Sequence, residues 1–422
     1  MARIVQKYGG SSVADLQLIT SVARRAIAAK NAGHEVVVVL SAMKGETDRL
    51  LKMAREACPT PDPRETDNLL STGEQVSTAL FALVCHGLGE TVKSFLGFQA
   101  GVMTDKAHGR ARILNVNPAR LRTELSKGRL AAVAGFQGIN ANDDITTLGR
   151  GGSDTTAVAL AAALKADVCE IYTDVDGIYT TDPHVCDKAR KIDRISYEEM
   201  LEMASLGAKV MEIRSVELGM NHGVKIHVRH ARSQAPGTII CEEDDDMEKA
   251  PVRGVTVSVN EARITLLKVP DRPGVAASIL SLISSAGIVV DMIIQNKSVS
   301  PADQSDPDQS WTDFSFTVPL ADYRQALELM TAAGREIGAQ EVVGDDHIAK
   351  VSIVGAGMRN HTGVAALMFQ TLADKKINIA MISTSEIKIS CIIEKDYAEL
   401  SVRALHEAFQ LDQVDGGRQT KV

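Results

Sequence analysis

The sequence of 422 residues predicts an α/β protein of three domains, in which one large layered domain precedes two small copies of a split βαβ unit. Two observations lead to this prediction. From residue 1 to about residue 240, short apolar runs alternate with amphipathic helical patterns, and beyond residue 250 one pattern occurs twice. We place the domain boundaries at 1–245, 246–345 and 346–422, and the second range includes the linker.

The strands and helices of the first domain follow from the spacing of apolar residues. Arg3–Gln6 reads as a strand, and Leu16, Ile19 and Val22 begin the apolar face of a helix. Val36–Leu40 is a continuous β-branched run, typical of a strand that is buried on both faces of a parallel sheet. Further strands are expected at 130–134, 168–172 and 224–228, and helices around 66–86, 154–165 and 196–206.

An acidic run and a repeat follow the first domain. Glu242–Asp246 carries five like charges in a row, which predicts a linker. Gly274–Ala277 then recurs as Gly363–Ala366, and Ile288–Ile293 matches residues 377–382 at the same offset. Each copy is expected to run strand, helix, strand, strand, helix, strand. The polar stretch Ser298–Ser310 is expected to be a mobile insertion.

Composition excludes several classes of protein. The 46 Lys and Arg against 54 Asp and Glu give a net charge of −8, which argues against nonspecific binding to nucleic acid or to a membrane surface. Six cysteines without a CxxC pair indicate reduced thiols rather than a zinc site or a disulfide framework. Without a signal peptide or an apolar run long enough to span a bilayer, we expect a cytoplasmic protein.

Three segments rich in glycine and polar residues follow predicted strands: Lys7–Ser12, Thr147–Asp154 and Tyr172–Pro183. The carboxyl ends of strands are where α/β proteins bind ligands, and paired glycines let the backbone approach a phosphate. Arg150 offers a planar fork for a carboxylate or a phosphate. None of the three fits the P-loop pattern, and each has a simpler interpretation as a tight turn.

Other residues could be read as metal or dinucleotide sites, but for each of them a purely structural interpretation has at least equal weight. Asp174 and Asp176 suit either a metal pair or a capped turn. Surface positions account for His222, His227 and His230 better than a metal site does. Gly355–Gly357 lacks the third glycine of a dinucleotide motif.

In order along the chain, these motifs resemble those of aspartokinases. Lys7–Val13 is similar to their KFGGTSV signature, and Ser71–Glu74 to their STGE segment. Gly149–Asp154 is similar to GRGGSD, and Thr173–Pro183 to TDVDGIYTTDP. The repeats resemble paired ACT domains. Tyr8 in place of Phe and Ser11 in place of Thr are mild departures, whereas His184 stands where the family commonly has Arg.

The resemblance implies an amino-acid kinase fold followed by two ferredoxin-like βαββαβ ACT domains. It also implies ATP-dependent phosphorylation of the side-chain carboxylate of L-aspartate to 4-phospho-L-aspartate. That reaction is the first step of lysine, threonine and methionine biosynthesis. ATP with Mg²⁺ is the expected co-substrate, and no metal site built from protein ligands alone is expected. Because a carboxylate with a pKa of about 3.9 is already ionised at pH 7, the reaction needs charge neutralisation rather than a general base.

Roles for individual residues also follow from the resemblance. The expected catalytic residues are Lys7, Glu74, Arg150 and Asp154. Aspartate is expected at Thr47, Glu74, Arg150, Gly151 and Ser153. ATP is expected at Lys7, Gly9, Gly10, Ser41, Thr173, Asp174, Tyr179 and Lys209.

The ACT pair implies feedback regulation by lysine, threonine or both, and a homo-oligomer formed through these domains. The expected threonine site is Asp271, Gly274, Ala276, Gln295, Asn378 and Ile379, and the expected lysine site is Asp291, Ser385 and Glu386. Gly274 and Gly363 precede helices, where a carboxylate can bind, although both also suit simple turns. The sequence leaves open which effector dominates, whether a separate regulatory chain starts near Met247, and whether the repeats interleave.

Two other functions stay open at this point. Another amino-acid kinase would share the nucleotide site but not the tandem ACT domains. A catalytically inactive regulatory subunit is the second alternative, and the presence of Lys7, Glu74, Arg150 and Asp154 argues against it.

Overall fold

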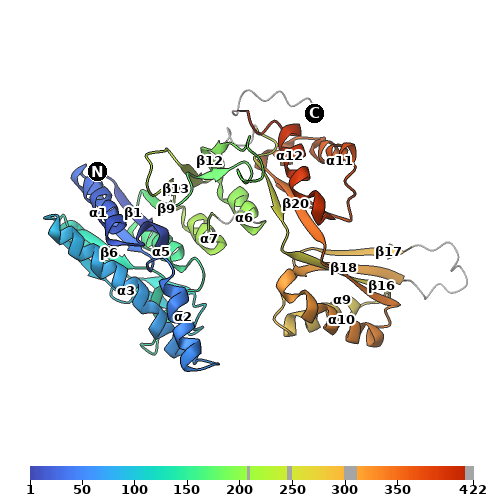
Figure 1. Ribbon diagram of the computed structural model, residues 1–422, viewed down its shortest axis with the longest axis horizontal. Helices are drawn as coiled ribbons and strands as arrows, with labels where there is room; N and C mark the ends of the chain where they lie inside the picture. Colours follow the sequence, from blue (N-terminus) through green and yellow to red (C-terminus); the bar gives the residue numbers. More distant parts are fainter. Residues whose placement is uncertain (207–209, 245–249, 299–310, 414–422) are drawn as a thin grey trace, which may run out of the picture. The chain divides into compact units, whose positions relative to one another are not determined.

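The computed structural model describes residues 1–206, 210–244, 250–298 and 311–413, and its helices and strands form two compact units (Figure 1). Unit 1 comprises Met1–Thr180 and Arg190–Lys249, and unit 2 comprises Thr181–Ala189 and Ala250–Val422. The predicted roles of Lys209 and Met247 and most of the insertion at 298–310 lie outside the described residues. Among the helices of the described ranges, none is long and apolar enough to cross a membrane.

An eight-stranded sheet forms the centre of unit 1, in the order β12-β14-β13-β9-β1-β2-β6-β3. Its neighbouring strands pair in parallel, except for the antiparallel pair of β13 and β14. Val36 to Leu40 are buried, as predicted for a strand covered on both faces. The strands are β1 (Arg3–Tyr8), β2 (Glu35–Leu40), β3 (Val92–Phe95), β6 (Leu130–Ala134), β9 (Val168–Thr173), β12 (Arg194–Ser196), β13 (Ile226–His230) and β14 (Thr238–Cys241).

Helices cover this sheet, and β1 presents alternate residues to its two faces. Tyr8 packs in a core cluster that includes Ile19 of α1 and Phe81 of α3, whereas Lys7 reaches Asp154 of α5. The side chain of Asp15 caps α1 by accepting a hydrogen bond from the Leu18 N–H. The helices are α1 (Leu16–Asn31), α2 (Glu46–Ala57), α3 (Pro63–Gly87), α4 (Ala119–Ser126), α5 (Gly152–Leu164), α6 (Tyr197–Ser205) and α7 (Ile213–His222).

A small four-stranded sheet, which the sequence did not predict, completes unit 1. Its order is β5-β4-β7-β8, and none of its strands exceeds four residues, too few for a periodic pattern to stand out. The strands are β4 (Val102–Thr104), β5 (Ile113–Val116), β7 (Gln137–Ile139) and β8 (Ile145–Thr147). A separate two-stranded hairpin joins β10 (Ile178–Tyr179) to β11 (Lys191–Ile192).

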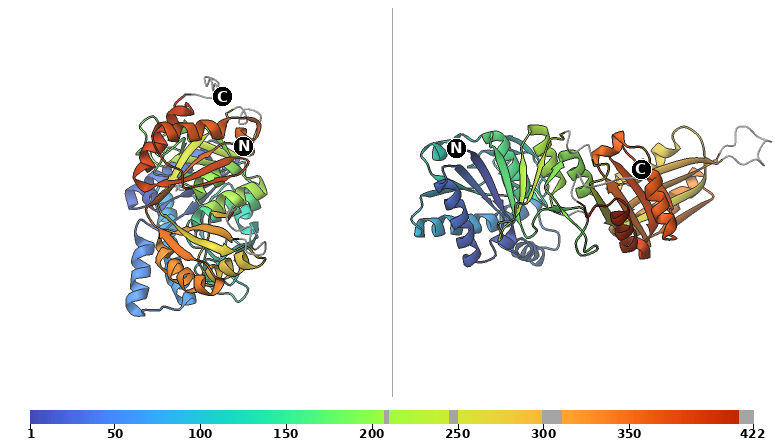
Figure 2. Two further views of the ribbon diagram at one scale, coloured as in Figure 1. Left: turned by 90° about the vertical axis from the view of Figure 1, so that its right-hand side faces the viewer. Right: turned by 90° about the horizontal axis from the view of Figure 1, so that it is seen from above.

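In the described part of unit 2 there are two four-stranded sheets, each packed against two α-helices (Figure 2). The first has the order β17-β18-β16-β19 and the second β15-β20-β22-β21. The strands are β15 (Gly254–Ser258), β16 (Glu261–Pro270), β17 (Ile293–Ser298), β18 (Trp311–Pro319), β19 (Glu341–Asp345), β20 (Ile348–Val354), β21 (Met381–Thr384) and β22 (Lys388–Glu394). The helices are α9 (Val275–Ser285), α10 (Tyr323–Ile337), α11 (Val364–Asp374) and α12 (Ala398–Ala408).

The two repeats of unit 2 interleave. In the first repeat the last strand, β19, follows α10, as the repeat pattern predicted. In the second repeat the equivalent edge position is filled by β15, which precedes the first repeat in sequence and pairs antiparallel with β20. A division of the chain at residue 345 would therefore separate β15 from the sheet in which it lies.

A short segment from the first predicted domain also belongs to unit 2. Residues 181–189 follow the end of the hairpin strand β10, but Val185 packs against the core of the second repeat and Cys186 is buried. Arg403 of α12 donates a hydrogen bond from Nη1 to the carbonyl oxygen of Val185 at 3.3 Å. His184, where the family commonly has Arg, is exposed.

Candidate active site

The end of β1 and the start of α5 form the charged centre of the candidate site. Lys7 is only 8% exposed, and its Nζ lies 2.5 Å from Oδ1 of Asp154. A Cβ atom on Gly9 would lie 3.7 Å from this ammonium group, in van der Waals contact with it, so the glycine keeps one side of the ammonium free of a side chain. A Cβ atom on Gly10 would lie 2.8 Å from the carbonyl oxygen of Ala42, so the close approach of these two loops requires glycine.

A buried carboxylate lies beside the loop that follows β2. Glu74 of α3 is 3% exposed, and its Oε1 accepts a hydrogen bond from the Ala42 N–H at 3.0 Å. Among the residues that the structure describes, its buried Oε2 has no hydrogen-bond partner. Burial raises the pKa of Glu74 to about 7, although the Ala42 N–H acts in the opposite direction. A cationic group would satisfy this oxygen and stabilise the ionised form.

Helix α3 is held against the same loop by close packing. A Cβ atom on Gly73 would lie 2.9 Å from the Cβ of Ala42. Ser77 donates a hydrogen bond from Oγ to the carbonyl oxygen of Ser41 at 2.7 Å, and Ser41 N–H in turn donates to the Tyr8 carbonyl at 3.1 Å. These contacts fix the position of the Glu74 carboxylate relative to the end of β1.

Arg150 is exposed in the loop between β8 and α5. Gly151 has a φ of 65°, and a Cβ atom there would lie 2.5 Å from side-chain carbons of Glu212. Burial raises the pKa of Glu212, and the Asp154 charge raises it further, whereas Arg214 and Arg150 lower it. The charges of Arg150 and Asp154 therefore both affect the pKa of Glu212, which places both residues near this carboxyl group, beside the first turn of α5.

Three of the residues expected at ATP, Thr173, Asp174 and Tyr179, lie at and beyond the end of β9. Thr173 donates a hydrogen bond from Oγ1 to Oδ1 of Asp174 at 3.1 Å, and Asp174 is exposed. Burial, with a contribution from the Asp176 charge, raises the pKa of Tyr179 in β10. Gly9 N–H donates to the Tyr172 carbonyl at 3.3 Å, so the ends of β1 and β9 lie side by side. Thr47, expected at aspartate, is partly buried in the first turn of α2.

Several residues that support the site were missed at the level of sequence. Tyr8 and Tyr172 stack with ring centroids 4.6 Å apart, and Arg25 lies over the Tyr172 ring. Glu170 accepts hydrogen bonds from the Tyr172 hydroxyl and from Arg229. Tyr8, Glu170 and Tyr172 alternate with the site residues along β1 and β9, and that alternation is the signal that could have identified their role.

Arg214 was also missed. Its guanidinium donates to the carbonyl oxygens of Leu148 at 2.7 Å and Ala111 at 2.8 Å, so it holds the loop that carries Arg150.

The expected effector residues are distributed over both repeats of unit 2. Asp271, Gly274 and Ala276 lie where β16 leads into α9, and Gln295 lies on β17. Asn378 and Ile379 precede β21, and Ser385 and Glu386 form the turn between β21 and β22. Gly274 and Gly363 both adopt left-handed backbone conformations, with φ of 99° and 88°, so the turn geometry alone already favours glycine at each position.

Asp291, expected at the lysine site, already pairs with a lysine of the chain itself. Lys350 of β20 has a side chain that is 4% exposed, and its Nζ forms an ion pair with Asp291 and lies 2.6 Å from Oε1 of Glu261. Burial alone would lower the pKa of Lys350, but the two carboxylates outweigh it and raise that pKa. An effector ammonium at Asp291 would share or displace this partner.

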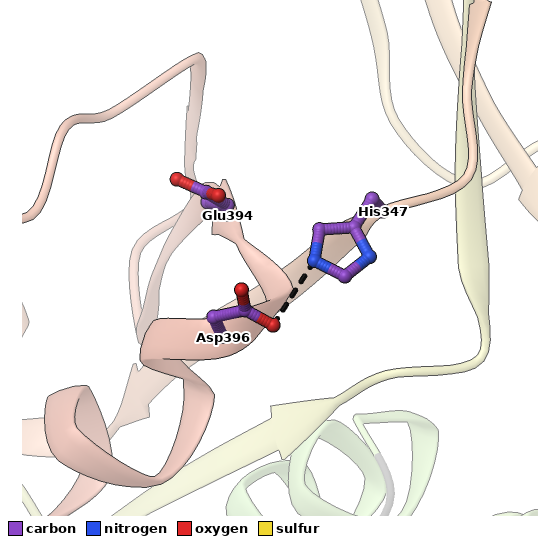
Figure 3. A group of neighbouring side chains, drawn as sticks. All are labelled: His347, Glu394 and Asp396. Atoms are coloured by element: carbon purple, nitrogen blue, oxygen red, sulfur yellow. Dashed lines mark hydrogen bonds and ion pairs between the residues drawn. The ribbon is translucent and has the colours of Figure 1, made fainter.

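Unit 2 also holds a group of three potential metal ligands (Figure 3). His347 Nε2 lies 3.0 Å from Oδ1 of Asp396, and Glu394 extends from the end of β22 beside them. All three side chains are exposed. An exposed contact between a histidine and a carboxylate contributes little to stability, and none of the three residues belongs to the candidate active site.

Comparison with known proteins identifies the family. The model of the amino acid kinase family matches residues 2–230, and an ACT domain model matches residues 351–409. An aspartokinase of Pseudomonas aeruginosa is 52% identical over 98% of each chain, and one of Mycolicibacterium smegmatis is 50% identical over 97% of each. The crystal structure of E. coli aspartokinase III with aspartate and ADP has a TM-score of 0.76 and 26% identity, and the match covers 96% of this chain and 99% of that one. The chain therefore belongs to the aspartokinases, with an amino-acid kinase domain and an ACT region.

Proposed function

We propose that this protein transfers the γ-phosphoryl group of ATP to the side-chain carboxylate of L-aspartate and so forms 4-phospho-L-aspartate. The observation that carries the proposal is the pairing of Lys7 with Asp154 at a glycine-lined strand end. Glu74, with its unpartnered oxygen, and the exposed Arg150 complete the site. A relative of this chain, E. coli aspartokinase III, has been crystallised with aspartate and ADP.

Lys7 is the group best suited to stabilise the transferring phosphoryl group. The acceptor carboxylate is already ionised, so the main barrier is repulsion between two anions. An ammonium group held in a largely water-excluded position reduces this repulsion more than it would in water. Asp154 fixes the direction of the Lys7 side chain, and glycine at position 9 keeps a further side chain out of contact with the ammonium.

Glu74 and Arg150 suit the two charged groups on the α-carbon of aspartate. Oε2 of Glu74 is a buried acceptor without a partner, which fits the α-ammonium. Arg150 is exposed and presents a planar fork of donors, which fits the α-carboxylate. With both groups bound, the side-chain carboxylate of the substrate would be the one free to react.

Mg²⁺ is expected to enter with ATP. Carboxylate oxygens are ligands that Mg²⁺ prefers, and the exposed carboxylate of Asp174 at the end of β9 fits a metal–nucleotide complex. The bound ion would supply additional neutralisation of phosphate charge.

Unit 2 is proposed to be the regulatory part, responding to lysine, threonine or both, and to mediate homo-oligomer formation. Its two interleaved ACT-like repeats support this role, as does a crystal structure of E. coli aspartokinase III with lysine and aspartate. An effector that lowers substrate affinity 100-fold would require a coupling free energy of about 2.7 kcal/mol, which is within the usual allosteric range.

The decisive experiment is a coupled assay of ADP release with aspartate, glutamate, acetylglutamate and UMP as acceptors, with hydroxylamine added to trap an acyl phosphate. We expect turnover and a hydroxamate product with aspartate, and inhibition when lysine and threonine are titrated in. Turnover with another acceptor would favour a different amino-acid kinase. Absence of turnover with all four would favour an inactive regulatory subunit.

A further inference from the structure

A fully buried carboxylate on α3 lies at the centre of a hydrogen-bond cluster that the proposed chemistry does not use. Asp67 has no exposed surface. Its Oδ2 accepts hydrogen bonds from His108 Nδ1 at 2.8 Å, from Gly109 N–H at 3.0 Å and from Thr147 N–H at 3.0 Å. Its Oδ1 accepts from the Thr147 hydroxyl at 2.5 Å. Because a carboxylate only accepts, Nδ1 of His108 is the protonated ring nitrogen.

The partners of Asp67 come from two other parts of the fold. His108 and Gly109 lie in the loop between β4 and β5, and Thr147 is the last residue of β8. The Asp67 carboxylate accepts hydrogen bonds from the N–H and the hydroxyl of Thr147, from His108 Nδ1 and from the Gly109 N–H. Asp67 therefore joins α3, the loop between β4 and β5, and β8. Hydrogen bonds to a charged acceptor are shorter and stronger than neutral ones, which makes this junction rigid.

The junction controls the loop that carries Arg150. Thr147 is three residues before Arg150, so its position sets where the loop begins. A Cβ atom on Gly149, which has a φ of 77°, would lie 3.0 Å from the carbonyl oxygen of Gly109. The Arg150 loop therefore lies directly against the loop that Asp67 holds.

The same helix also carries Glu74. Asp67 precedes Glu74 by about two turns, so both carboxylates project from one face of α3. One of them is the proposed contact for the substrate ammonium, and the other holds the base of the loop that offers the guanidinium. The distance between Glu74 and the Arg150 loop, the two proposed contacts for the substrate, is thus set by helix α3.

We infer that Asp67, with His108 and Thr147, is a positioning cluster that fixes the Arg150 loop relative to Glu74 and thereby sets the affinity for the amino-acid substrate. The inference rests on the proposed function. Catalytic groups misplaced by as little as about 1 Å can lose about 100-fold in rate, so a junction of this kind has a measurable effect on the reaction. The residues at the ends of β1 and β9 make none of the hydrogen bonds that Asp67 accepts from His108, Gly109 and Thr147.

Thr147→Val and Thr146→Val form a matched pair for the test. Thr146 and Thr147 are neighbours on β8, and both are buried. The Thr146 hydroxyl pairs with the hydroxyl of Thr104 at 2.6 Å, away from Asp67. Each valine variant therefore removes one buried hydroxyl hydrogen bond. The one that Thr147 donates to the Asp67 carboxylate is the stronger, and only Thr147→Val affects the cluster.

We expect Thr147→Val to raise the KM for aspartate about tenfold, as the loss of one charge-assisted hydrogen bond would, while the KM for ATP changes by less than about twofold. Thr146→Val should leave both values near wild type. Thr147→Ser, which keeps the hydroxyl, should restore aspartate binding. His108→Ala removes a donor at a partly exposed position and should raise the KM for aspartate in the same direction, even if Thr147→Val folds poorly.

Equal KM values for aspartate in the two valine variants, or a parallel rise for ATP, would show a purely structural cluster and overturn the inference. An unchanged aspartate KM in His108→Ala together with failure of Thr147→Ser to restore binding would do the same. A wild-type protein without aspartate-dependent turnover would refute the proposed function itself, and the inference with it.

Discussion

Glu74→Gln tests the buried carboxylate with little change in shape. The amide keeps an oxygen that can accept the Ala42 N–H, and it replaces the second carboxylate oxygen and its charge by a neutral NH2 group. Oε2 of Glu74 has no hydrogen-bond partner within the described part of the chain, and burial raises the pKa of the carboxyl to about 7 from an ordinary value of 4.5. The substitution should therefore affect stability and substrate binding in opposite directions.

The effect on stability depends on pH. Because the folded protein holds the proton on Glu74 more tightly than the unfolded chain does, its stability falls as the pH rises from 4.5 to about 7 and then stays constant. The difference between the two pKa values corresponds to about 3 kcal/mol of lost stability above pH 7, and to less than about 1 kcal/mol at pH 5. Glutamine does not ionise, so Glu74→Gln should be more stable than wild type at pH 8 and nearly equal to it at pH 5.

The effect on binding has the opposite sign. Only the ionised carboxylate attracts the α-ammonium of aspartate, so with a pKa of about 7 the KM for aspartate of the wild type should fall about tenfold between pH 6 and pH 8. In Glu74→Gln the KM should be higher and independent of pH over this range. Urea denaturation of the full chain at pH 5 and pH 8, together with the KM profile, measures both effects.

Glu170→Gln is the matched control. Glu170 is another buried carboxylate of unit 1, but it is paired with Arg229 and accepts hydrogen bonds from Gln6 and Tyr172. Removal of its charge leaves a guanidinium without its partner and should destabilise the protein. If Glu74→Gln is instead less stable than wild type at pH 8, or retains the pH dependence of the aspartate KM, the reasoning about Glu74 is wrong.

Four further substitutions test other parts of the site and fold. Lys7→Ala should lower kcat at least about 100-fold while the KM for aspartate changes little, because the ammonium acts on the phosphoryl group; near-normal turnover would refute that role. Arg150→Ala should mainly raise the KM for aspartate in the same steady-state assay, and an unchanged KM would count against the assignment. Gly10→Ala places a Cβ atom 2.8 Å from the Ala42 carbonyl, so a loss of about 1–3 kcal/mol is expected in urea denaturation, along with reduced turnover. Lys350→Met leaves the buried Glu261 carboxylate without its cation, whereas the half-exposed Asp291 can be hydrated. The variant should destabilise unit 2 by up to about 3 kcal/mol, and normal stability would show that the Lys350–Glu261 pair is replaceable.

The sequence predicted the parts of the fold in which local pattern and tertiary environment agree. Val36–Leu40 is apolar throughout because both faces of β2 are covered, and the predicted strand is confirmed. The predicted strand at Leu130–Ala134 is confirmed for the same reason. The motif at Lys7–Ser12 was informative because a glycine pair directly after a strand favours a close approach of two backbone segments, and Gly10 does approach Ala42 closely.

Features decided by pairing between distant segments could not be predicted in this way. The five residues of β15 would fit the edge of either sheet in unit 2, and only the assembled structure shows that they pair with β20. Residues 181–189 carry no pattern that would separate them from the preceding loop. Asp67 looks like an ordinary polar residue near the start of a helix, because its partners lie about 40 and 80 residues further along the chain.

The energetics of the site favour an active enzyme over an inactive regulatory subunit. An unpartnered buried carboxylate such as Glu74 destabilises the folded chain at neutral pH, and a single substitution to glutamine would remove that cost. Lys7 and Asp154 are likewise almost enclosed, where a charged pair contributes little net stability. Stability alone accounts for neither arrangement. The ammonium group of aspartate would pair with Glu74, and the transferring phosphoryl group of ATP would pair with Lys7. The chain therefore carries groups whose free-energy cost is offset only when substrate is bound, as expected of a preorganised active site.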